Sequence, residues 1–127
     1  MNKDKLFYLA VPYSGTKEEK EHRYEAVSAL CASLIGMGYN VFSPITHSHT
    51  LERDFGCFIS HSEWMRMDLR YLSHCDGLLV YKMPGWEDSV GVQQEIAFAK
   101  DKGMPVVYFE YIHGLIEQST ILKLVEG

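Results

Sequence analysis

The stretch from residue 78 to residue 102 constrains the fold more than any other, because it joins a buried strand to a helix through a turn of small residues. Leu78-Leu79-Val80-Tyr81 is a short apolar run, typical of a strand that is buried on both faces. The helical pattern of residues 89–102 follows a turn that contains Pro84 and Gly85. The stretch therefore predicts a strand-turn-helix unit, and open α/β sheets bind ligands at this edge.

Strands and helices are predicted to alternate along the chain. The expected strands are residues 5–11, 39–42, 78–82 and 106–109, and the expected helices are residues 16–37, 62–74 and 89–102. This alternation predicts a parallel sheet with right-handed crossovers and helices on both faces. The length of 127 residues is enough for one domain. We therefore expect a single three-layer α/β domain over residues 1–127, with a Rossmann-like parallel sheet of about five strands.

Two segments do not fit this alternation. Residues 45–60 hold few periodic apolar side chains and are expected to form a functional or mobile loop. The tail from Ile112 is expected to form a closing helix, or a helix that packs on another subunit. This expectation rests on its apolar residues, which are Leu115, Ile116, Ile121, Leu122 and Val125. A chain this short also predicts a homo-oligomer, either a dimer or a tetramer.

The composition indicates which partners to expect. The chain carries 12 Lys and Arg against 17 Asp and Glu, a net charge of −5 without a basic cluster, so a nucleic acid polymer is not expected as a partner. No apolar run has the length of a membrane span, and no signal peptide is recognisable. Three cysteines without paired spacing are typical of a reduced protein. We expect a cytoplasmic protein that binds a small molecule.

Two carboxylates are the strongest candidates for chemistry. Glu95 lies one turn inside the helix that follows the small-residue turn, and Asp68 lies in the middle of the helix at 62–74, where Asp is a poor helix former. Each has a plain alternative, because Glu95 can satisfy the helix dipole at the surface and Asp68 can lie on a solvated helix face. At one sheet edge, the two would supply a nucleophile and a proton shuttle, which glycosidic cleavage requires.

Two aromatic residues and the small-residue turn could complete such a site. Tyr8 is either a core residue or a donor at the carboxyl end of its strand that orients a carboxylate. Trp86 either plugs the edge of the core or covers a base by stacking. Ser89 and Gly91, at the start of the helix, allow a ligand phosphate to come close to the backbone.

Three histidines raise the alternative of a metal site. His47, His49 and His61 lie in or near the predicted loop. The chain has no His-Glu-x-x-His motif and no cysteine at ligand spacing, which are the patterns of many zinc sites. A polar substrate loop is therefore favoured, and neither a metal nor a cofactor is expected.

Several of these residues lie in stretches that resemble one known family. The stretches are Tyr8-Leu9-Ala10-Val11-Pro12-Tyr13, Asp68 with Cys75-Asp76, and Pro84-Gly85-Trp86 continuing to Ser89, Gly91 and Glu95. From about residue 6 to residue 109, the chain resembles the nucleoside 2-deoxyribosyltransferase superfamily and is also similar to its 2′-deoxynucleoside 5′-monophosphate N-hydrolases. Within the superfamily, it is most similar to small uncharacterised proteins with the stretches Ser43-Pro44-Ile45-x-His47-Ser48-His49 and Pro-Gly-Trp.

The resemblance implies a flavodoxin-like parallel sheet, an oligomer, and cleavage or exchange of the N-glycosidic bond of a 2′-deoxynucleoside or its 5′-monophosphate. It implies that Glu95 is the nucleophile, Asp68 the acid/base and Tyr8 the residue that orients the nucleophile. Ser89 stands at the phosphate-binding position of the hydrolase branch, six residues before the glutamate. The other residues expected to contact the substrate are Ser14, Pro84, Gly91, Trp86, His47 and His49, of which the last three would frame the base.

The chain departs from this family at two points. Gln93 stands where a small residue is common, and Pro12-Tyr13-Ser14-Gly15-Thr16 replaces the Gly-Arg-rich phosphate loop. Two other functions stay open beside the enzyme. The first is a nucleotide-binding or sensing module on the same fold without turnover. The second is a metal-dependent hydrolase built on the three histidines.

Overall fold

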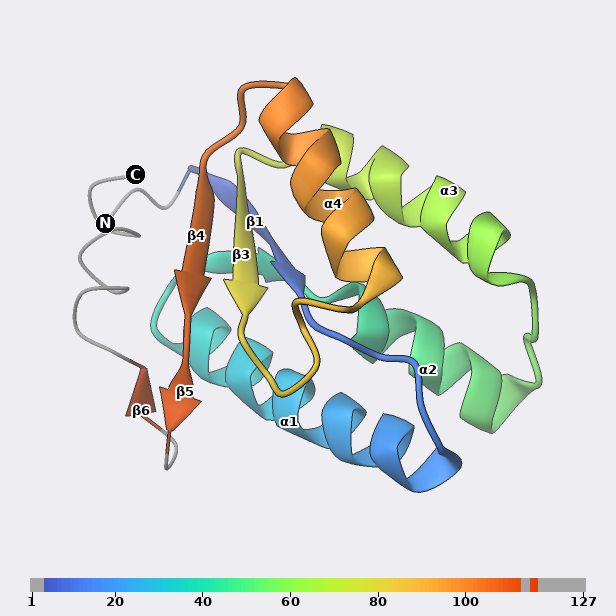
Figure 1. Cartoon of the computed structure of the whole chain (residues 1–127). Coiled ribbons are helices and arrows are strands. Elements are labelled where there is room, and N and C mark those ends of the chain that lie inside the picture. Colours follow the sequence, from blue (N-terminus) through green and yellow to red (C-terminus); the bar gives the residue numbers. More distant parts are fainter. Residues whose placement is uncertain (1–3, 113–114, 117–127) are drawn as a thin grey trace.

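The computed structural model describes residues 4–112 and 115–116, in which a parallel sheet lies between two layers of helices (Figure 1). The strands of the sheet are β1 (Leu6–Ala10), β2 (Asn40–Phe42), β3 (Gly77–Tyr81) and β4 (Val106–Phe109). The helices are α1 (Lys17–Gly36), α2 (Pro44–Phe55), α3 (His61–Ser73) and α4 (Val90–Asp101). The strand order is β2-β1-β3-β4, and each neighbouring pair is parallel. The predicted three-layer α/β fold is confirmed, with four strands in this sheet rather than the expected number of about five.

The two faces of the sheet have separate cores, and β1 contributes to both. Phe7 and Leu9 belong to the core that α1 covers. Tyr8 belongs to the core on the other face, where it packs with residues of α3 and α4 such as Leu72 and Val92. Successive side chains of a strand point to opposite faces. The position of Tyr8 in β1 therefore decides that its side chain faces α3 and α4.

Side-chain caps begin α1, α3 and α4 within one residue of where the sequence predicts these helices to start. Thr16 and Glu19 form a reciprocal capping box at the start of α1, and Ser60 and Glu63 do the same at the start of α3. Ser89 caps α4 by accepting a hydrogen bond from the backbone of its first turn. Such caps satisfy N–H groups that lack a partner inside the helix and usually contribute about 1 kcal/mol each. The cap at Ser89 fixes where α4 starts beyond the carboxyl end of β3.

Helix α2 occupies most of the segment 45–60, so the loop predicted there is wrong for most of its length. Local signals for the helix are present, because Ser43 caps it, Pro44 stands in its first turn, and Gly56 ends it with a left-handed φ of 68°. Hydrophobic periodicity did not reveal the helix because its buried residues include polar ones, among them His49.

A short antiparallel hairpin follows β4. Its strands are β5 (Tyr111–Ile112) and β6 (Leu115–Ile116). The helix predicted from Ile112 onward is therefore wrong at Leu115 and Ile116, since a short apolar run does not by itself distinguish a strand from a helix. The rest of the apolar tail, which is Ile121, Leu122 and Val125, lies outside the described residues.

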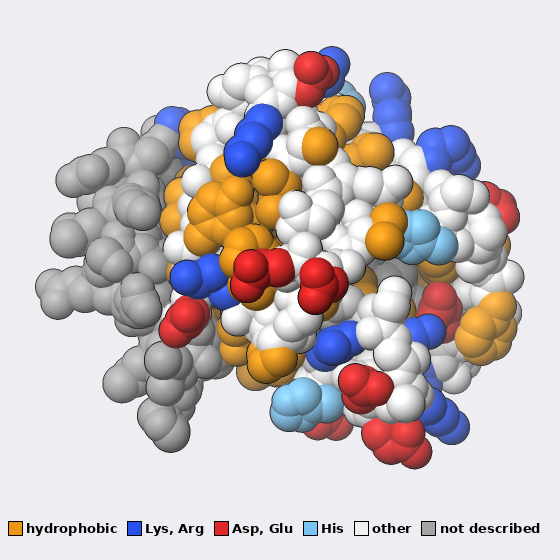
Figure 2. Space-filling model, in the orientation of Figure 1, with side chains coloured by type: hydrophobic (Ala, Val, Ile, Leu, Met, Phe, Trp, Pro, Cys, Tyr) orange, Lys and Arg blue, Asp and Glu red, His pale blue; other side chains and the backbone are white. Residues whose placement is uncertain are grey.

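Charged side chains of both signs are interspersed on the face of the molecule shown in Figure 2. That face therefore offers no continuous basic track for a phosphate backbone. Apolar side chains gather on the same face over β3 and β4 (Figure 2). In the described part of the chain, no helix combines the length and the apolar character that crossing a bilayer requires.

Candidate functional site

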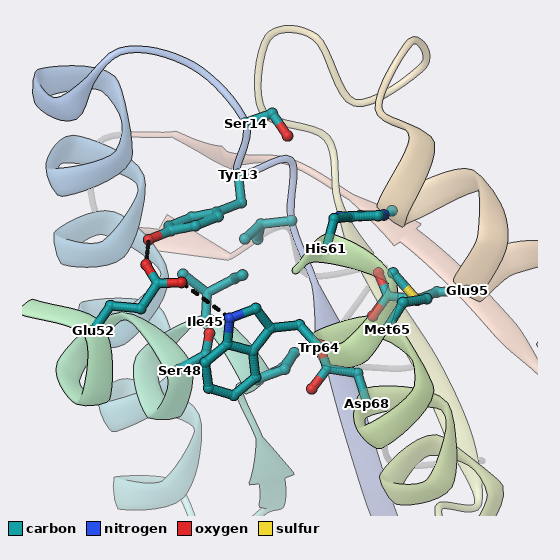
Figure 3. A pocket seen from close by; sticks show the side chains of 13 residues that line it. Tyr13, Ser14, Ile45, Ser48, Glu52, His61, Trp64, Met65, Asp68 and Glu95 are labelled. Carbon is teal, nitrogen blue, oxygen red and sulfur yellow. Dashed lines mark hydrogen bonds between the residues drawn. The ribbon is translucent and has the colours of Figure 1, made fainter. Parts of the chain in front are cut away.

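A cavity lies beyond the carboxyl end of β1, where side chains from α2, α3 and α4 meet (Figure 3). Its volume is about 80 Å3. Its lining consists of Val11, Tyr13, Ser14, Pro44, Ile45, Ser48, Glu52, His61, Trp64, Met65, Asp68, Gly91 and Glu95. The cavity therefore brings together four of the residues expected at one site, namely Glu95, Asp68, Gly91 and Ser14.

Glu95 is a buried carboxyl group of this cavity. Only 5% of the residue is exposed, and its neighbours Val92 and Ile96 hold α4 against the sheet. Burial raises the pKa of Glu95 to about 8. The negative charge of Asp68 also raises this pKa, whereas an interaction with the Tyr8 hydroxyl lowers it. The alternative that Glu95 is a surface residue satisfying the helix dipole is therefore wrong.

Asp68 reaches the same cavity from α3. It is 8% exposed, so the alternative of a solvated helix face is wrong as well. Burial raises the pKa of Asp68 to about 6, while the nearby His61 lowers it. Because both carboxyl groups have raised pKa values, the pair with Glu95 keeps a proton at a pH where free carboxyl groups have lost theirs.

Tyr8 lies beside this pair and is completely buried. Its hydroxyl interacts with Glu95 but does not reach the geometry of a full hydrogen bond to any described residue. Burial raises the pKa of Tyr8 well above its ordinary value, and the negative charges of Glu95 and Asp68 raise it further. The phenol therefore stays protonated and can act as a donor toward Glu95.

Small residues border the cavity where α4 begins. Ser14 and Gly91 line it, and a Cβ atom at Gly91 would stand 3.4 Å from the methyl group of Met65 and 3.7 Å from the ring of His61. A side chain at this position would therefore narrow the cavity. Ser89 is not part of the lining. Its oxygen caps α4 at 3.3 Å, and its O–H group can still donate at a helix end where anions are favoured.

Trp86 and Pro84 do not line the cavity. Trp86 packs against Tyr108, with ring centroids 5.6 Å apart, at the edge of the core under α3 and α4. Pro84 borders a separate surface depression beside Arg23 of α1. Of the two alternatives for Trp86, the structure shows the one in which its side chain packs at the edge of the core. It reaches this position because the turn after β3 folds toward β4.

The three histidines are engaged at separate places. His47 packs beside Tyr71, His49 lies behind Tyr13, and His61 lines the cavity. His47 and His49 therefore do not line the cavity themselves. Within residues 4–112 and 115–116, no group of three or more His, Cys, Asp or Glu side chains is arranged to hold a metal ion. The proposed three-histidine metal site is not assembled there.

Tyr13, Glu52 and Trp64 form the side of the cavity that faces Asp68 and Glu95 (Figure 3). The Trp64 indole N–H donates to Glu52 Oε1 at 3.0 Å, and the Tyr13 hydroxyl lies 3.3 Å from Glu52 Oε2. None of these three residues was predicted from the sequence to line the site. Tyr13 carried a signal, since it follows the first strand closely. Glu52 carried no such signal, because it lies in the segment 45–60, for which the sequence predicts a loop.

A buried histidine supports Tyr13 from behind. The Tyr13 hydroxyl lies 2.6 Å from His49 Nδ1, and His49 Nε2 lies 2.6 Å from a carboxylate oxygen of Glu21. The His49 ring stacks on Tyr24, with centroids 4.4 Å apart. Burial, followed by the negative charge of Glu52, raises the pKa of Tyr13, so that this phenol also stays protonated.

Two solved structures share the fold of this chain. The first is a 2-deoxyribosyltransferase from Bacillus psychrosaccharolyticus, with 24% identity and a TM-score of 0.57 over 91% of this chain and 79% of that chain. The second is a 2-deoxyribosyltransferase from Leishmania mexicana, with 17% identity and a TM-score of 0.55 over 84% of this chain and 65% of that chain. At these identities the likeness establishes a shared fold.

No curated protein matches this chain. A protein-family model matches residues 5–111 of the chain. This range includes the whole four-stranded sheet and every residue that lines the cavity. That family is described only as a domain of unknown function. The chain therefore belongs to the DUF1937 family, which it matches over residues 5–111.

Proposed function

We propose that this protein cleaves or exchanges the N-glycosidic bond of a 2′-deoxynucleoside or its 5′-monophosphate. The observation that carries the proposal is the pair of buried carboxyl groups, Glu95 and Asp68, which share one cavity at the ligand-binding edge of the sheet. The structural likeness to two 2-deoxyribosyltransferases supports the same class of chemistry by analogy of fold.

The proposed reaction has two steps. The Glu95 carboxylate attacks C1′ of the sugar and the bond from C1′ to the base nitrogen breaks, while Asp68 gives its proton to the departing base. The ester between Glu95 and the sugar is then resolved by water or by a second base, whose proton returns to Asp68. Tyr8, protonated and buried beside Glu95, is the residue that holds the nucleophile in line.

The proton count of the carboxyl pair fits this reaction. With pKa values of about 8 for Glu95 and about 6 for Asp68, the pair holds one proton around neutral pH. Attack with simultaneous protonation of the base needs one ionised and one protonated group. The values belong to the coupled pair, so a shift of the shared proton to Asp68 produces the reactive form.

A 5′-phosphate would lie near the start of α4. Ser89 and the backbone N–H groups there favour an anion, and Ser14 borders the cavity from the loop after β1. A serine can donate to a phosphate, whereas a carboxylate at this position would repel it. This is the reason for preferring a monophosphate over a free nucleoside.

The first test is a panel of ribonucleosides, deoxyribonucleosides and their 5′-monophosphates, incubated with the protein with and without an acceptor base. Free base and exchanged product are followed by chromatography. We expect base release from deoxyribose substrates by the unchanged chain and loss of release in Glu95→Gln. The matched control is Glu25→Gln, which makes the same chemical change on an exposed part of α1. Full activity in Glu95→Gln would rule out the mechanism.

A nucleotide-binding module without turnover is the second candidate. The observation that favours it is the raised pKa of Glu95, because a nucleophile must be ionised and burial favours the neutral form. This candidate predicts nucleotide binding without base release, unchanged when Glu95 becomes Gln. The homo-oligomer expected from the chain length and the cytoplasmic location stay predictions.

A further inference from the structure

The side of the cavity opposite Glu95 has more hydrogen-bond acceptors than protons. We call Tyr13, Ser48 and Glu52 the acceptor wall; all three line the cavity (Figure 3). A carboxylate accepts only, and a phenol or an alcohol brings a single proton. The chemistry of this wall therefore restricts which ligand can bind against it.

The Tyr13 hydroxyl contacts both His49 and Glu52. His49 Nε2 faces the Glu21 carboxylate at 2.6 Å, and because a carboxylate only accepts, this nitrogen is the donor. The Tyr13 hydroxyl lies 2.6 Å from His49 Nδ1 and donates to Glu52 Oε2 at 3.3 Å. This distance is long for an O–H···O hydrogen bond, so Glu52 Oε2 remains open to a stronger donor.

The position of Glu52 is well determined. The Trp64 indole donates to Oε1 at 3.0 Å, which ties α2 to α3. Each carboxylate oxygen has two lone pairs, so both oxygens of Glu52 retain accepting capacity after these contacts. A ligand group with N–H donors would bind to these two oxygens, whereas a ligand acceptor that faced Glu52 would be repelled.

We propose that Glu52 determines specificity by binding a nucleobase edge with two adjacent N–H donors, which among the common bases is the N1–H and N2–H edge of guanine. This inference rests on the proposed function, because it assumes a nucleoside in the cavity. Adenine and cytosine place a ring acceptor beside their amino group, and thymine flanks its single N–H with two carbonyls. The Ser48 hydroxyl, one turn before Glu52 on α2, can donate to the O6 atom of the same base.

Equilibrium binding separates this inference from the proposed function. Calorimetry is done on Glu95→Gln protein, which keeps the base attached, with 2′-deoxyguanosine and 2′-deoxyinosine, which differ only in the N2 amino group. We expect 2′-deoxyguanosine to bind at least about tenfold more tightly, as a hydrogen bond to a charged group warrants. Adding Glu52→Gln should bring the ratio near unity, and adding Glu25→Gln should leave it unchanged.

Equal affinities in the Glu95→Gln protein, or no binding of either nucleoside, would overturn the inference without need of the Glu52 variant. A tenfold ratio that survives Glu52→Gln would overturn it as well. If the protein with Glu52→Gln does not fold, as judged by circular dichroism, the ratio of the two nucleoside affinities in the Glu95→Gln protein decides whether the inference stands. Base release by the unchanged chain together with equal affinities would keep the proposed function and reject this inference. A preference for 2′-deoxyguanosine without any base release by the unchanged chain would keep this inference and reject the proposed function.

Discussion

The Trp64 indole and the Glu52 carboxylate meet at 3.0 Å and join α3 to α2 across one side of the cavity. The two residues lie 12 positions apart in sequence, and neither belongs to the turn between β3 and α4. Their contact completes the cavity around Glu95 and Asp68. It also makes Trp64 a natural reporter of ligand binding.

Ligand binding should change the fluorescence of Trp64 and leave that of Trp86 unaffected. The chain has two tryptophans, of which Trp64 lines a cavity of about 80 Å3 and Trp86 packs on Tyr108 outside it. A nucleoside cannot enter so narrow a space without moving side chains. Titration with 2′-deoxyguanosine, excited selectively at tryptophan, should change the emission of Trp86→Phe protein. The emission of Trp64→Phe protein should stay constant, and the opposite pattern would place the ligand near the turn after β3.

The substitution Glu95→Gln should stabilise the protein at high pH. The pKa of Glu95 is about 8 in the folded protein and near its ordinary value of 4.5 in the unfolded chain, so the folded state binds the extra proton between these values. Stability of the unchanged chain therefore falls as pH rises from 4.5 to 8. Thermal unfolding should show little difference at the acid end of this window and an advantage of about 2–5 kcal/mol for the variant above it. An exposed control, Glu25→Gln, should show no such dependence on pH.

The pH profile of kcat/KM should be bell-shaped. Activity should rise as pH passes about 6, where the carboxyl pair loses its first proton, and fall as pH passes about 8, where it loses its second. Asp68→Asn leaves a single titrating carboxyl group and should remove the bell shape along with most of the activity. Initial rates of base release over this range provide the measurement. A flat profile in the unchanged chain would show that the pair does not share the proton of the reaction.

Replacing Tyr8 by Phe should reduce activity without reducing stability. The hydroxyl is buried and makes no full hydrogen bond to a described residue, so its removal should change the free energy of unfolding by less than about 1 kcal/mol. Loss of the donor that orients Glu95 should lower kcat by roughly tenfold to a hundredfold. Parallel urea unfolding and steady-state kinetics separate the two effects. A stability loss in proportion to the activity loss would mean that Tyr8 is only a core residue.

Ser89→Asp should separate monophosphate from nucleoside substrates. Aspartate caps a helix about as well as serine, so α4 should stay as stable. Its negative charge should repel a 5′-phosphate and lower kcat/KM for the monophosphate by about tenfold or more, with no loss for the free deoxynucleoside. Thr16→Asp, at the cap of α1, is the control that changes the same charge elsewhere. Equal losses of kcat/KM for both substrates would show that the 5′-phosphate does not bind at the start of α4.

Most of the fold followed from local patterns in the sequence. The runs at β1, β3 and β4 are apolar and short, and α1, α3 and α4 begin at side-chain caps that local sequence specifies. Glu95 could be singled out for the same reason, because it follows a small-residue turn and a cap in one continuous stretch. These signals act within a few residues, so a single sequence shows them.

Helix α2 and the cavity side that it supports depended on contacts between distant parts of the chain. Its buried residues include Ser48 and His49, whose burial is possible only because other elements supply partners, such as Tyr13 and Glu21 for His49. Hydrophobic periodicity does not register such a helix, since polar groups become buried only when a hydrogen-bond partner from elsewhere in the fold compensates them. The same long-range packing places Trp86 at the edge of the core and Glu52 in the lining of the cavity. No local sequence pattern indicated either position.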